Sequence, residues 1–363
     1  MEQTLYVEFV KKYFPQLVLS ITERLNGKSN TELSYRFKQL LAPKFSVDGR
    51  WESLTGNYTR VAADVVAMDS PLPLKKRDSL SRASGDIPKL GMELFLNEKQ
   101  MSDIDAMIAR GVDVNTIVQA IFEDTPRVIS GIYERLEGMF LSGLSSGVAV
   151  VEEKDNPGTG VRVDYGYLTA NQFGVPTVWT GNPTTATPID DIEKVIRKAT
   201  DDGNRIVRAY ADKYWFDAFC KSQQAREQFA FIQGFVGDKI PNLSEDQASA
   251  AMQNKFGFPV EKIDRAIRTE KNGKQTVTRP WKEGTIVFVC DDQVGSLAWT
   301  NLAEMNHPVA GVTYQTAENY ILVSKYRENR PALREYTTSQ ARVVPVITDV
   351  DRIYTLDIKT VQA

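Results

Sequence analysis

The stretch TPIDDIEKVIRKATDDG, residues 187–203, carries signals for both ends of a helix. Thr187 suits the N-cap, Pro188 suits the first helical position, and Asp190 stands where an acidic side chain reaches back to the cap. Gly203 offers the left-handed conformation that ends many helices. Between these ends runs an apolar stripe at helical spacing, formed by Ile189, Ile192, Ile196 and Ala199. The stretch predicts an amphipathic helix packed within a folded domain.

The bulk composition is that of a globular protein. The 363 residues are 42% hydrophobic and 25% charged, and the chain is long enough for one large core or two smaller ones. A formal net charge of −3 gives no overall basic field, so tight nonspecific binding of nucleic acid by the whole chain is not expected. No apolar segment approaches the roughly 20 residues of a membrane span, and the N-terminal residues show no secretory signal. We expect a protein of a cytoplasm-like compartment.

The first half of the chain predicts two helical regions separated by an extended arm. Residues 3–25 carry apolar residues at helical spacing interrupted by Pro15, which predicts one kinked helix or two short ones. Residues 98–145 predict the longest helical feature, with a cap or kink at Thr125 and Pro126. An amphipathic N-terminal helix of this kind, we expect, contributes an apolar face to self-association.

The arm, residues 51–95, has a different character. It contains a strand-like run at 60–66, a stretch rich in proline, serine and basic residues at 70–88, and a returning strand at 90–96. The basic cluster Lys75-Lys76-Arg77 lies within it. Such an arm has too little apolar content for a core of its own, so we expect residues 70–88 to form the tip of a loop that packs on another surface.

The second half predicts short strands alternating with helices. Asn272 and Gly273 between strand-like runs give the strongest hairpin signal in the chain. A turn is expected at residues 156–158. Strands are expected at 147–153, 160–168, 205–210 and 284–290 and as a pair within 338–361, and helices are expected within 212–229 and at 244–256.

Few residues suit catalysis. GLSSG at residues 143–147 matches the G-x-S-x-G pattern of a hydrolase nucleophile, Ser145, but a helix precedes it and a strand follows, which reverses the required order. Cys290 with His307, the only histidine, could form a nucleophile and base, yet Cys290 ends a strand that reads as buried. Cys220 likewise reads as a reduced core thiol. We therefore assign no catalytic residue.

Metal and cofactor signals are equally weak. A single histidine excludes a multi-histidine metal site. The acidic pairs occur at element boundaries, where aspartate commonly serves caps and turns. These pairs are Asp190-Asp191, Asp201-Asp202 and Asp291-Asp292. The glycines at 158–160 lack the third glycine and the helix of a dinucleotide loop. We assign no metal ligand and no cofactor-binding residue.

Three stretches in order carry a family resemblance. The first is VDYGYL at 163–168, followed by Trp179 and, nine positions on, PIDDIEKVI. The second is RIVRAYADKYWFDAF at 205–219. The third is the C-terminal run that ends in TLDIKTV, with Arg334, Glu335, Gln340, Pro345, Asp349 and Asp351. Together they resemble the major capsid proteins of tailed phages of the lambda capsid protein E family.

The resemblance implies an α+β fold of the Hong Kong 97-like capsid type. Its parts would be an N-terminal arm at 1–48, an extended loop at 49–96, a peripheral domain with a spine helix at 97–186 and 327–363, and an axial domain at 187–326. The glycines Gly131 and Gly138 within the spine region depart from what we expect of such a helix.

The same resemblance implies a structural protein and not an enzyme. Many copies would assemble into hexamers and pentamers of an icosahedral phage head around double-stranded DNA, which is contacted nonspecifically. Further partners would be a portal protein and scaffold or decoration proteins, with no membrane. Assembly would take place in the host bacterial cytoplasm, and the final location would be the virion capsid.

Three alternatives stay open. An encapsulin-type protein nanocompartment shares the fold expected here. A cytoplasmic hydrolase would use Ser145 or Cys290. A nucleic-acid-binding module would use the basic arm, against the acidic balance of the whole chain.

Overall fold

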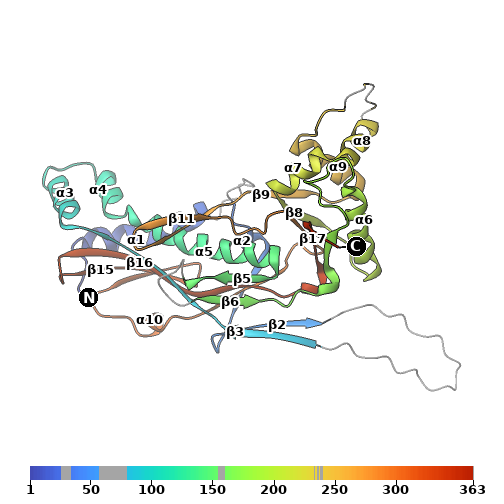
Figure 1. The fold of residues 1–363 in the computed structure, drawn as a ribbon. Helices are drawn as coiled ribbons and strands as arrows, with labels where there is room; N and C mark the ends of the chain where they lie inside the picture. Colours follow the sequence, from blue (N-terminus) through green and yellow to red (C-terminus); the bar gives the residue numbers. More distant parts are fainter. Residues whose placement is uncertain are drawn as a thin grey trace, which may run out of the picture.

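The computed structural model describes residues 1–25, 34–56, 80–153, 160–232, 234, 237 and 240–362. Figure 1 shows an elongated body with a helical lobe at one end and a two-stranded hairpin pointing away from it. The sheets are built mostly from antiparallel strand pairs and are packed against separate groups of helices, which confirms the predicted α+β class.

A six-stranded sheet forms the body. Its long strand β16 pairs with β15 over its first half, with β13 over its second half, and with β4 along its other edge. The remaining strands extend the sheet, β14 beside β15 and β1 parallel to β13. The members are β1 (Leu41–Phe45), β4 (Lys89–Leu96), β13 (Gly295–Thr300), β14 (Thr313–Ala317), β15 (Ile321–Glu328) and β16 (Arg334–Ile347).

Helices cover this sheet. The longest, α5, contacts β16, and Ser339 of that strand donates a hydrogen bond of 2.6 Å from its hydroxyl to the carbonyl of Val128. Its apolar positions recur every three or four residues and are fully buried, as at Ile132, Leu136 and Phe140. The helices that pack on this core are α1 (Val7–Leu25), α2 (Arg36–Leu40), α3 (Glu98–Ala109), α4 (Val114–Ile121) and α5 (Asp124–Ser146). The short helix α10 (Ala303–Asn306) lies apart from them and buries none of its side chains.

The predicted helical region 98–145 is divided into α3, α4 and α5. The first break lies at Gly111, whose φ of +67° lies in the left-handed region. The second precedes Asp124, close to the predicted boundary at Thr125 and Pro126. The apolar periodicity continues through both breaks because all three helices pack against the same core.

The N-terminal helix α1 corrects one expectation. It runs unbroken through Pro15, and its apolar stripe lies against the chain's own core, with Phe14 stacked on Phe122 at 5.9 Å between ring centroids. Val10 and Phe14 have no exposed surface at all. This stripe is therefore already used within the subunit and cannot supply the apolar face for self-association.

A five-stranded sheet leads into the lobe. Its order is β7-β17-β12-β8-β9, and the strands are β7 (Gln172–Val175), β8 (Arg208–Asp212), β9 (Val260–Ile263), β12 (Thr285–Val289) and β17 (Ile353–Val361). The lobe's helices are α6 (Pro188–Asp201), α7 (Lys213–Lys221), α8 (Gln223–Ile232) and α9 (Glu245–Phe256). Two short 3-10 turns, η2 (Thr169–Asn171) and η3 (Val350–Arg352), lead into β7 and β17.

Strand β12 contributes alternate side chains to two hydrophobic cores. Ile286 and Phe288 face the helices of the lobe, whereas Val287 and Val289 face the core around α5. Because successive side chains point to opposite faces of a strand, one buried strand serves both cores. Strands β13–β15 belong to the first core, although the sequence-based domain boundary groups them with the axial domain at 187–326.

Three hairpins complete the described chain: β2 (Arg50–Gly56) with β3 (Leu80–Asp86), β5 (Val148–Val151) with β6 (Val161–Asp164), and β10 (Ile267–Lys271) with β11 (Lys274–Thr278). The last turns at Asn272 and Gly273, with φ of +53° and +74°, as predicted.

The predicted arm is only partly described. The predicted strand at 60–66, the turn at 156–158 and residues 70–79 of the predicted loop tip lie outside the described residues. Residues 80–86 belong to a paired strand and not to a tip. The predicted returning strand 90–96 is β4, which joins the six-stranded sheet.

Candidate functional site

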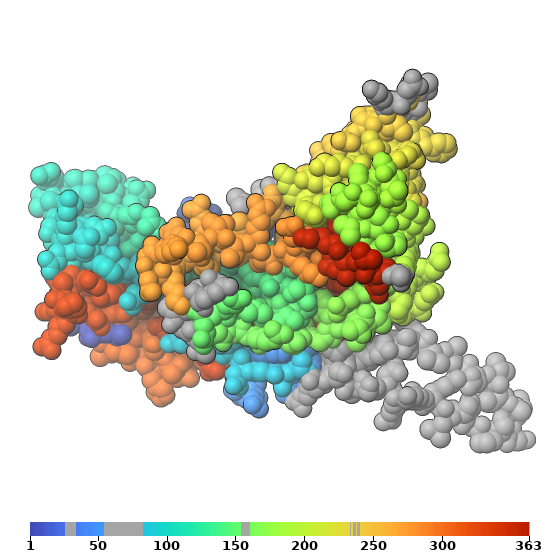
Figure 2. Space-filling model, in the orientation of Figure 1, coloured from blue at the N-terminus to red at the C-terminus, as the bar shows by residue number. Residues whose placement is uncertain are grey.

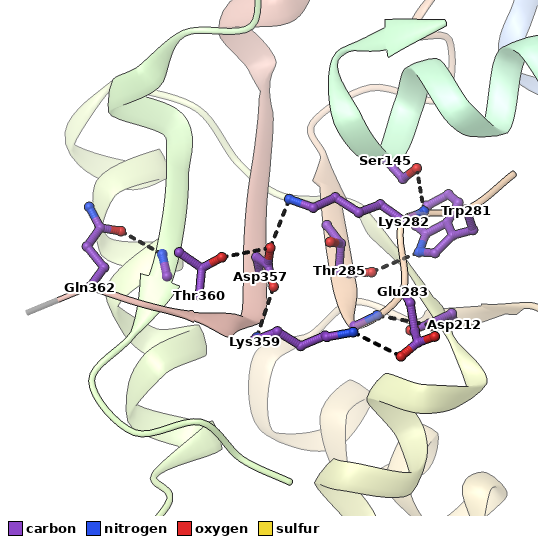
Figure 3. Close-up of polar contacts among 12 residues, drawn as sticks. Ser145, Asp212, Trp281, Lys282, Glu283, Thr285, Asp357, Lys359, Thr360 and Gln362 are labelled. Atoms are coloured by element: carbon purple, nitrogen blue, oxygen red, sulfur yellow. Dashed lines mark hydrogen bonds and ion pairs between the residues drawn. The ribbon is translucent and has the colours of Figure 1, made fainter. Parts of the chain in front are cut away.

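Ser145 lies in the last turn of α5 and is 2% exposed. Its hydroxyl donates to the Leu141 carbonyl at 2.8 Å and accepts the backbone N–H of Lys282 at 2.9 Å (Figure 3). A nucleophilic serine needs a base to take its proton, but this proton is held by a backbone carbonyl. The serine lies at the end of a helix, and strand β5 follows, which is the order of helix and strand that the sequence indicated. Its geometry is that of a structural contact.

Cys290 and His307 lie in different parts of the fold. Cys290 directly follows β12. Burial, and to a smaller extent the negative charge of Asp291, raises the pKa of its thiol to about 12. The thiolate is the reactive form, so this thiol is unreactive near neutral pH. His307 is exposed on the turn after α10, beside the six-stranded sheet. The structure does not bring the two together as a nucleophile and base.

The second cysteine is also a core thiol. Cys220 is buried in α7, and burial raises its pKa to about 11.

The paired aspartates serve structural contacts. Asp202 accepts hydrogen bonds from Lys198 and from the Tyr354 hydroxyl, and Asp291 forms an ion pair with Arg352. Within the described part of the chain, no three histidine, cysteine, aspartate or glutamate side chains gather as a group that could hold a metal ion.

The helix at 187–203 is held by partners that its own sequence does not reveal. Thr187 occupies the N-cap but makes no side-chain cap hydrogen bond; instead Gln224 of α8 accepts the backbone N–H of Ile189 at 2.9 Å. Asp191, not Asp190, has the structural role, accepting the indole N–H of buried Trp179 at 2.8 Å. This contact gives a physical reason for the spacing of Trp179 and the PIDDIEKVI run. Gly203 takes the left-handed conformation as predicted, with φ of +78°.

A polar network joins α5 to the five-stranded sheet (Figure 3). Besides the contact with Ser145, Lys282 forms an ion pair of 2.8 Å with Asp357 of β17. Although burial opposes ionisation of Asp357, hydrogen bonds from Lys282 and from the backbone N–H of Lys359 hold its pKa below the ordinary value. Asp212 accepts the N–H of Gly284 at 3.1 Å and also caps α7. The residues before β12 therefore bind both cores at once.

Among the side chains that the structure describes, those that anchor the β2–β3 hairpin to the body lie at its base. Trp51 is buried there against Gly85, where an added Cβ would lie 2.8 Å from the indole nitrogen. The Ser53 hydroxyl donates to the Ile347 carbonyl at 3.2 Å, at the end of β16. Beyond these contacts the paired strands leave the body, as Figure 1 shows. The hairpin forms a separate two-stranded sheet.

Comparison with known proteins identifies the family. A sequence profile described as phage major capsid protein E matches residues 55–358. The chain belongs to this family. It is a structural protein of the phage capsid, and its place is in the virion. No curated protein sequence matches it.

Solved structures agree with the capsid fold. A prophage capsid protein of E. coli CFT073 is 13% identical, with a TM-score of 0.56 over 94% of this chain and 98% of the other. A phage-related protein of Bordetella bronchiseptica RB50 is also 13% identical, with a TM-score of 0.51 over 96% and 98%. The SrpI encapsulin of Synechococcus elongatus PCC 7942 reaches a TM-score of 0.43 at 12% identity, over 95% and 96%.

The two cores are joined by the shared strand β12 and by the network around Lys282. Sequence reasoning missed Lys282, Asp357 and Asp212, because their partners are distant in sequence. Among the described helices, none is long and apolar enough to cross a membrane.

Proposed function

We propose that this chain is the repeating subunit of an icosahedral phage head, in which its hexamers and pentamers enclose double-stranded DNA. Its family membership and the fold shared with a prophage capsid protein support this proposal. The formal net charge of −3 favours nonspecific and weak contact with the DNA.

The observation that carries the proposal is the β2–β3 hairpin. An isolated two-stranded hairpin is at best marginally stable in water, yet this one extends from the body, and its described anchoring side chains lie at the base. A neighbouring subunit would supply the missing contacts. Repetition of one head-to-tail contact closes into rings, which is how capsomers would form.

The domain division stays a proposal, with altered boundaries. The core around α5, which includes β13–β16, would be the peripheral domain, and the core around α6–α9 would be the axial domain. The two hydrophobic cores favour moving residues 295–328 from the predicted axial domain to the peripheral domain, and β17 in the other direction. Residues 1–48 then belong with the peripheral domain, because α1 and α2 pack on its core.

We further propose that the chain has no catalytic activity, because the contacts of Ser145 and Cys290 are structural. Assembly in the host bacterial cytoplasm, with a portal protein and scaffold or decoration proteins as partners, is part of the same proposal and follows from the family.

Microscopy tests the proposal directly. Purified protein should show capsomers, shells or tubes by negative-stain microscopy. The apparent molar mass from light scattering should rise with protein concentration. A clean monomer of 40.7 kDa over a wide range of concentration and salt would contradict it. Esterase or protease activity lost on Ser145→Ala or Cys290→Ser would contradict the purely structural role.

A further inference from the structure

Strand β4 forms one edge of the six-stranded sheet. It pairs with β16 over all eight of its residues, and no described strand pairs with its other side. In an antiparallel pair the N–H and C=O groups of every second residue point away from the partner strand, so about half of the backbone groups of β4 face outward. β4 crosses the body between the β2–β3 hairpin and helices α3 and α4, whose atoms form separate projections in Figure 2.

The other edges of the two larger sheets are shorter or better protected. The edge strand β1 contains Pro43, which has no N–H to donate, and β14 lies against helix α1. The edge strands β7 and β9 have four residues each. β4 contains no proline, and its pairing with β16 has no bulge. A long edge of this kind is a template for pairing with another chain.

The charges of β4 are self-complementary about Gly91. Lys89 and Glu93 are exposed, lie two residues on either side of Gly91, and stand on the same face of the sheet, because side chains alternate along a strand. Lys89 lies opposite Arg342 of β16, and neither forms an ion pair with a residue that the structure describes. Glu93 accepts the Tyr326 hydroxyl at 3.0 Å through one of its two carboxylate oxygens. A second carboxylate opposite Lys89 would offset the two adjoining positive charges.

We propose that β4 of one copy pairs antiparallel with β4 of a second copy, across a twofold axis through Gly91. This register places Lys89 of each copy opposite Glu93 of the other. On the opposite face it places Leu90 against Met92, which is 37% exposed in the single subunit, so the pairing also covers apolar surface. Gly91 has no side chain, and its two copies can therefore meet on the axis.

The inference rests on the proposed assembly of the chain and names one contact within it. A twofold contact brings identical surfaces together and joins two copies only, whereas a head-to-tail contact repeats around a ring. Pairing through β4 would therefore link a subunit of one ring to a subunit of the next. The occupant is a second copy of this chain, since the same strand carries both members of the charge pair.

Charge substitution tests the register. Lys89→Glu and Glu93→Lys should each raise the protein concentration needed for shells about tenfold, because two opposite-charge pairs per contact become like-charge pairs. An equimolar mixture of the two variants should assemble close to the wild-type concentration, since each contact between unlike variants again pairs opposite charges. Lys44→Glu, at an exposed position on the edge strand β1, is the matched control and should assemble like wild type. Weakening by both single variants without rescue in their mixture would overturn the register.

A cysteine on the axis tests the symmetry. An added Cβ at Gly91 would lie 3.5 Å from its nearest neighbour, the carbonyl oxygen of Ser339, which is an ordinary contact. In the proposed pair the two Cα atoms at this position lie about 4.5–5.5 Å apart, within the range that a disulfide spans. Assembled Gly91→Cys should therefore give covalent dimers on mild oxidation, and Lys44→Cys should not. The absence of dimers from assembled Gly91→Cys would exclude the twofold pairing.

The outcomes separate this inference from the proposed function. If wild type forms no assembly at all, the proposed function fails. If wild type forms shells and both charge variants form them at the same concentration, only the pairing through β4 is overturned. Rescue in the mixture of Lys89→Glu and Glu93→Lys, together with dimers from Gly91→Cys, would establish the contact and its symmetry.

Discussion

At the scale of single residues, helix α5 contains a fully buried carboxylate. Glu137 has no exposed surface, and its two oxygens accept the backbone N–H groups of Arg36 and Phe37, each at 3.1 Å. It thereby fixes the start of α2 on α5. Burial raises its pKa to about 7, against the opposing effect of those two hydrogen bonds and of Arg265 and Arg36.

Protonation of Glu137 should make stability depend on pH. Its folded pKa of about 7 lies above the ordinary 4.5, so the folded state holds the proton more tightly than the unfolded state. The contribution to stability is therefore fully present below pH 4.5 and is lost as pH rises to 7. The glutamine of Glu137→Gln stays neutral, so the variant should not lose stability in this way as pH rises. At about 1.4 kcal/mol per pKa unit, the loss of unfolding free energy in the wild type is up to about 3 kcal/mol.

Chemical denaturation of dilute protein at pH 4.5, 6 and 7.5 measures this effect. The difference in unfolding free energy between Glu137→Gln and wild type should shift in favour of the variant as pH rises. A difference that is constant over this range would show that Glu137 does not titrate within it.

At the scale of elements, the glycines of α5 allow close packing. An added Cβ at Gly131 would meet the sulfur of Met92 at 2.5 Å, and one at Gly138 would meet Ile267 at 2.8 Å. Gly143 lies directly against the buried ring of Tyr165, whose hydroxyl donates to the Pro345 carbonyl at 2.7 Å. These residues weaken the helix in isolation, but they let β4, β10 and Tyr165 approach its backbone.

Gly143→Ala should therefore destabilise the protein despite the better helix propensity of alanine. The gain of about 1 kcal/mol in propensity is opposed by overpacking against Tyr165, which costs about 1–3 kcal/mol and also strains its hydrogen bond. Ser130→Ala, at a half-buried position of the same helix, is the control and should be neutral or slightly stabilising. Thermal unfolding compares them; a rise in the melting temperature of Gly143→Ala would show that Tyr165 moves aside freely.

These elements show what the sequence can predict. The helix at α6, the Asn272 and Gly273 hairpin and the alternating strand β17 were predictable, because their signals are local and periodic. The pairing of β4 with β16 was not, since it joins residues more than 200 positions apart. The cap from Gln224 and the contact of Lys282 with Ser145 were not predictable either, because they join residues 35 and 137 positions apart.

The sequence also gives a local reason to assign no catalytic role to Ser145. Ser145 was set aside because of the order of helix and strand around it, and the structure has that order.

At the scale of the whole molecule, the two cores and the hairpin have different mechanical roles. The cores share β12 and are joined by the Lys282 network, so they should move as one body. The hairpin extends away from the body, and its described side chains that contact the body, among them Trp51 and Ser53, lie at its base. Folding and assembly should therefore be separable by changes confined to residues between the two strands.

A loop replacement tests that separation. Gly56 pairs with Leu80, so an Asn-Gly turn in place of residues 57–79 can close the hairpin while β2, β3 and their anchor remain. Unfolding of the dilute subunit should stay within about 1 kcal/mol of wild type, because no contact of the base is removed. Shell formation should be lost.

A second variant, Lys75→Ser/Lys76→Ser/Arg77→Ser, keeps the length of the loop and removes only its charge. Exposed ion pairs contribute about 0.2–1 kcal/mol each, so this variant should weaken assembly mainly at low salt. Normal shells from the Asn-Gly variant would show that the arm takes no part in assembly, and failure of that variant to fold would place residues 57–79 in the subunit's own core.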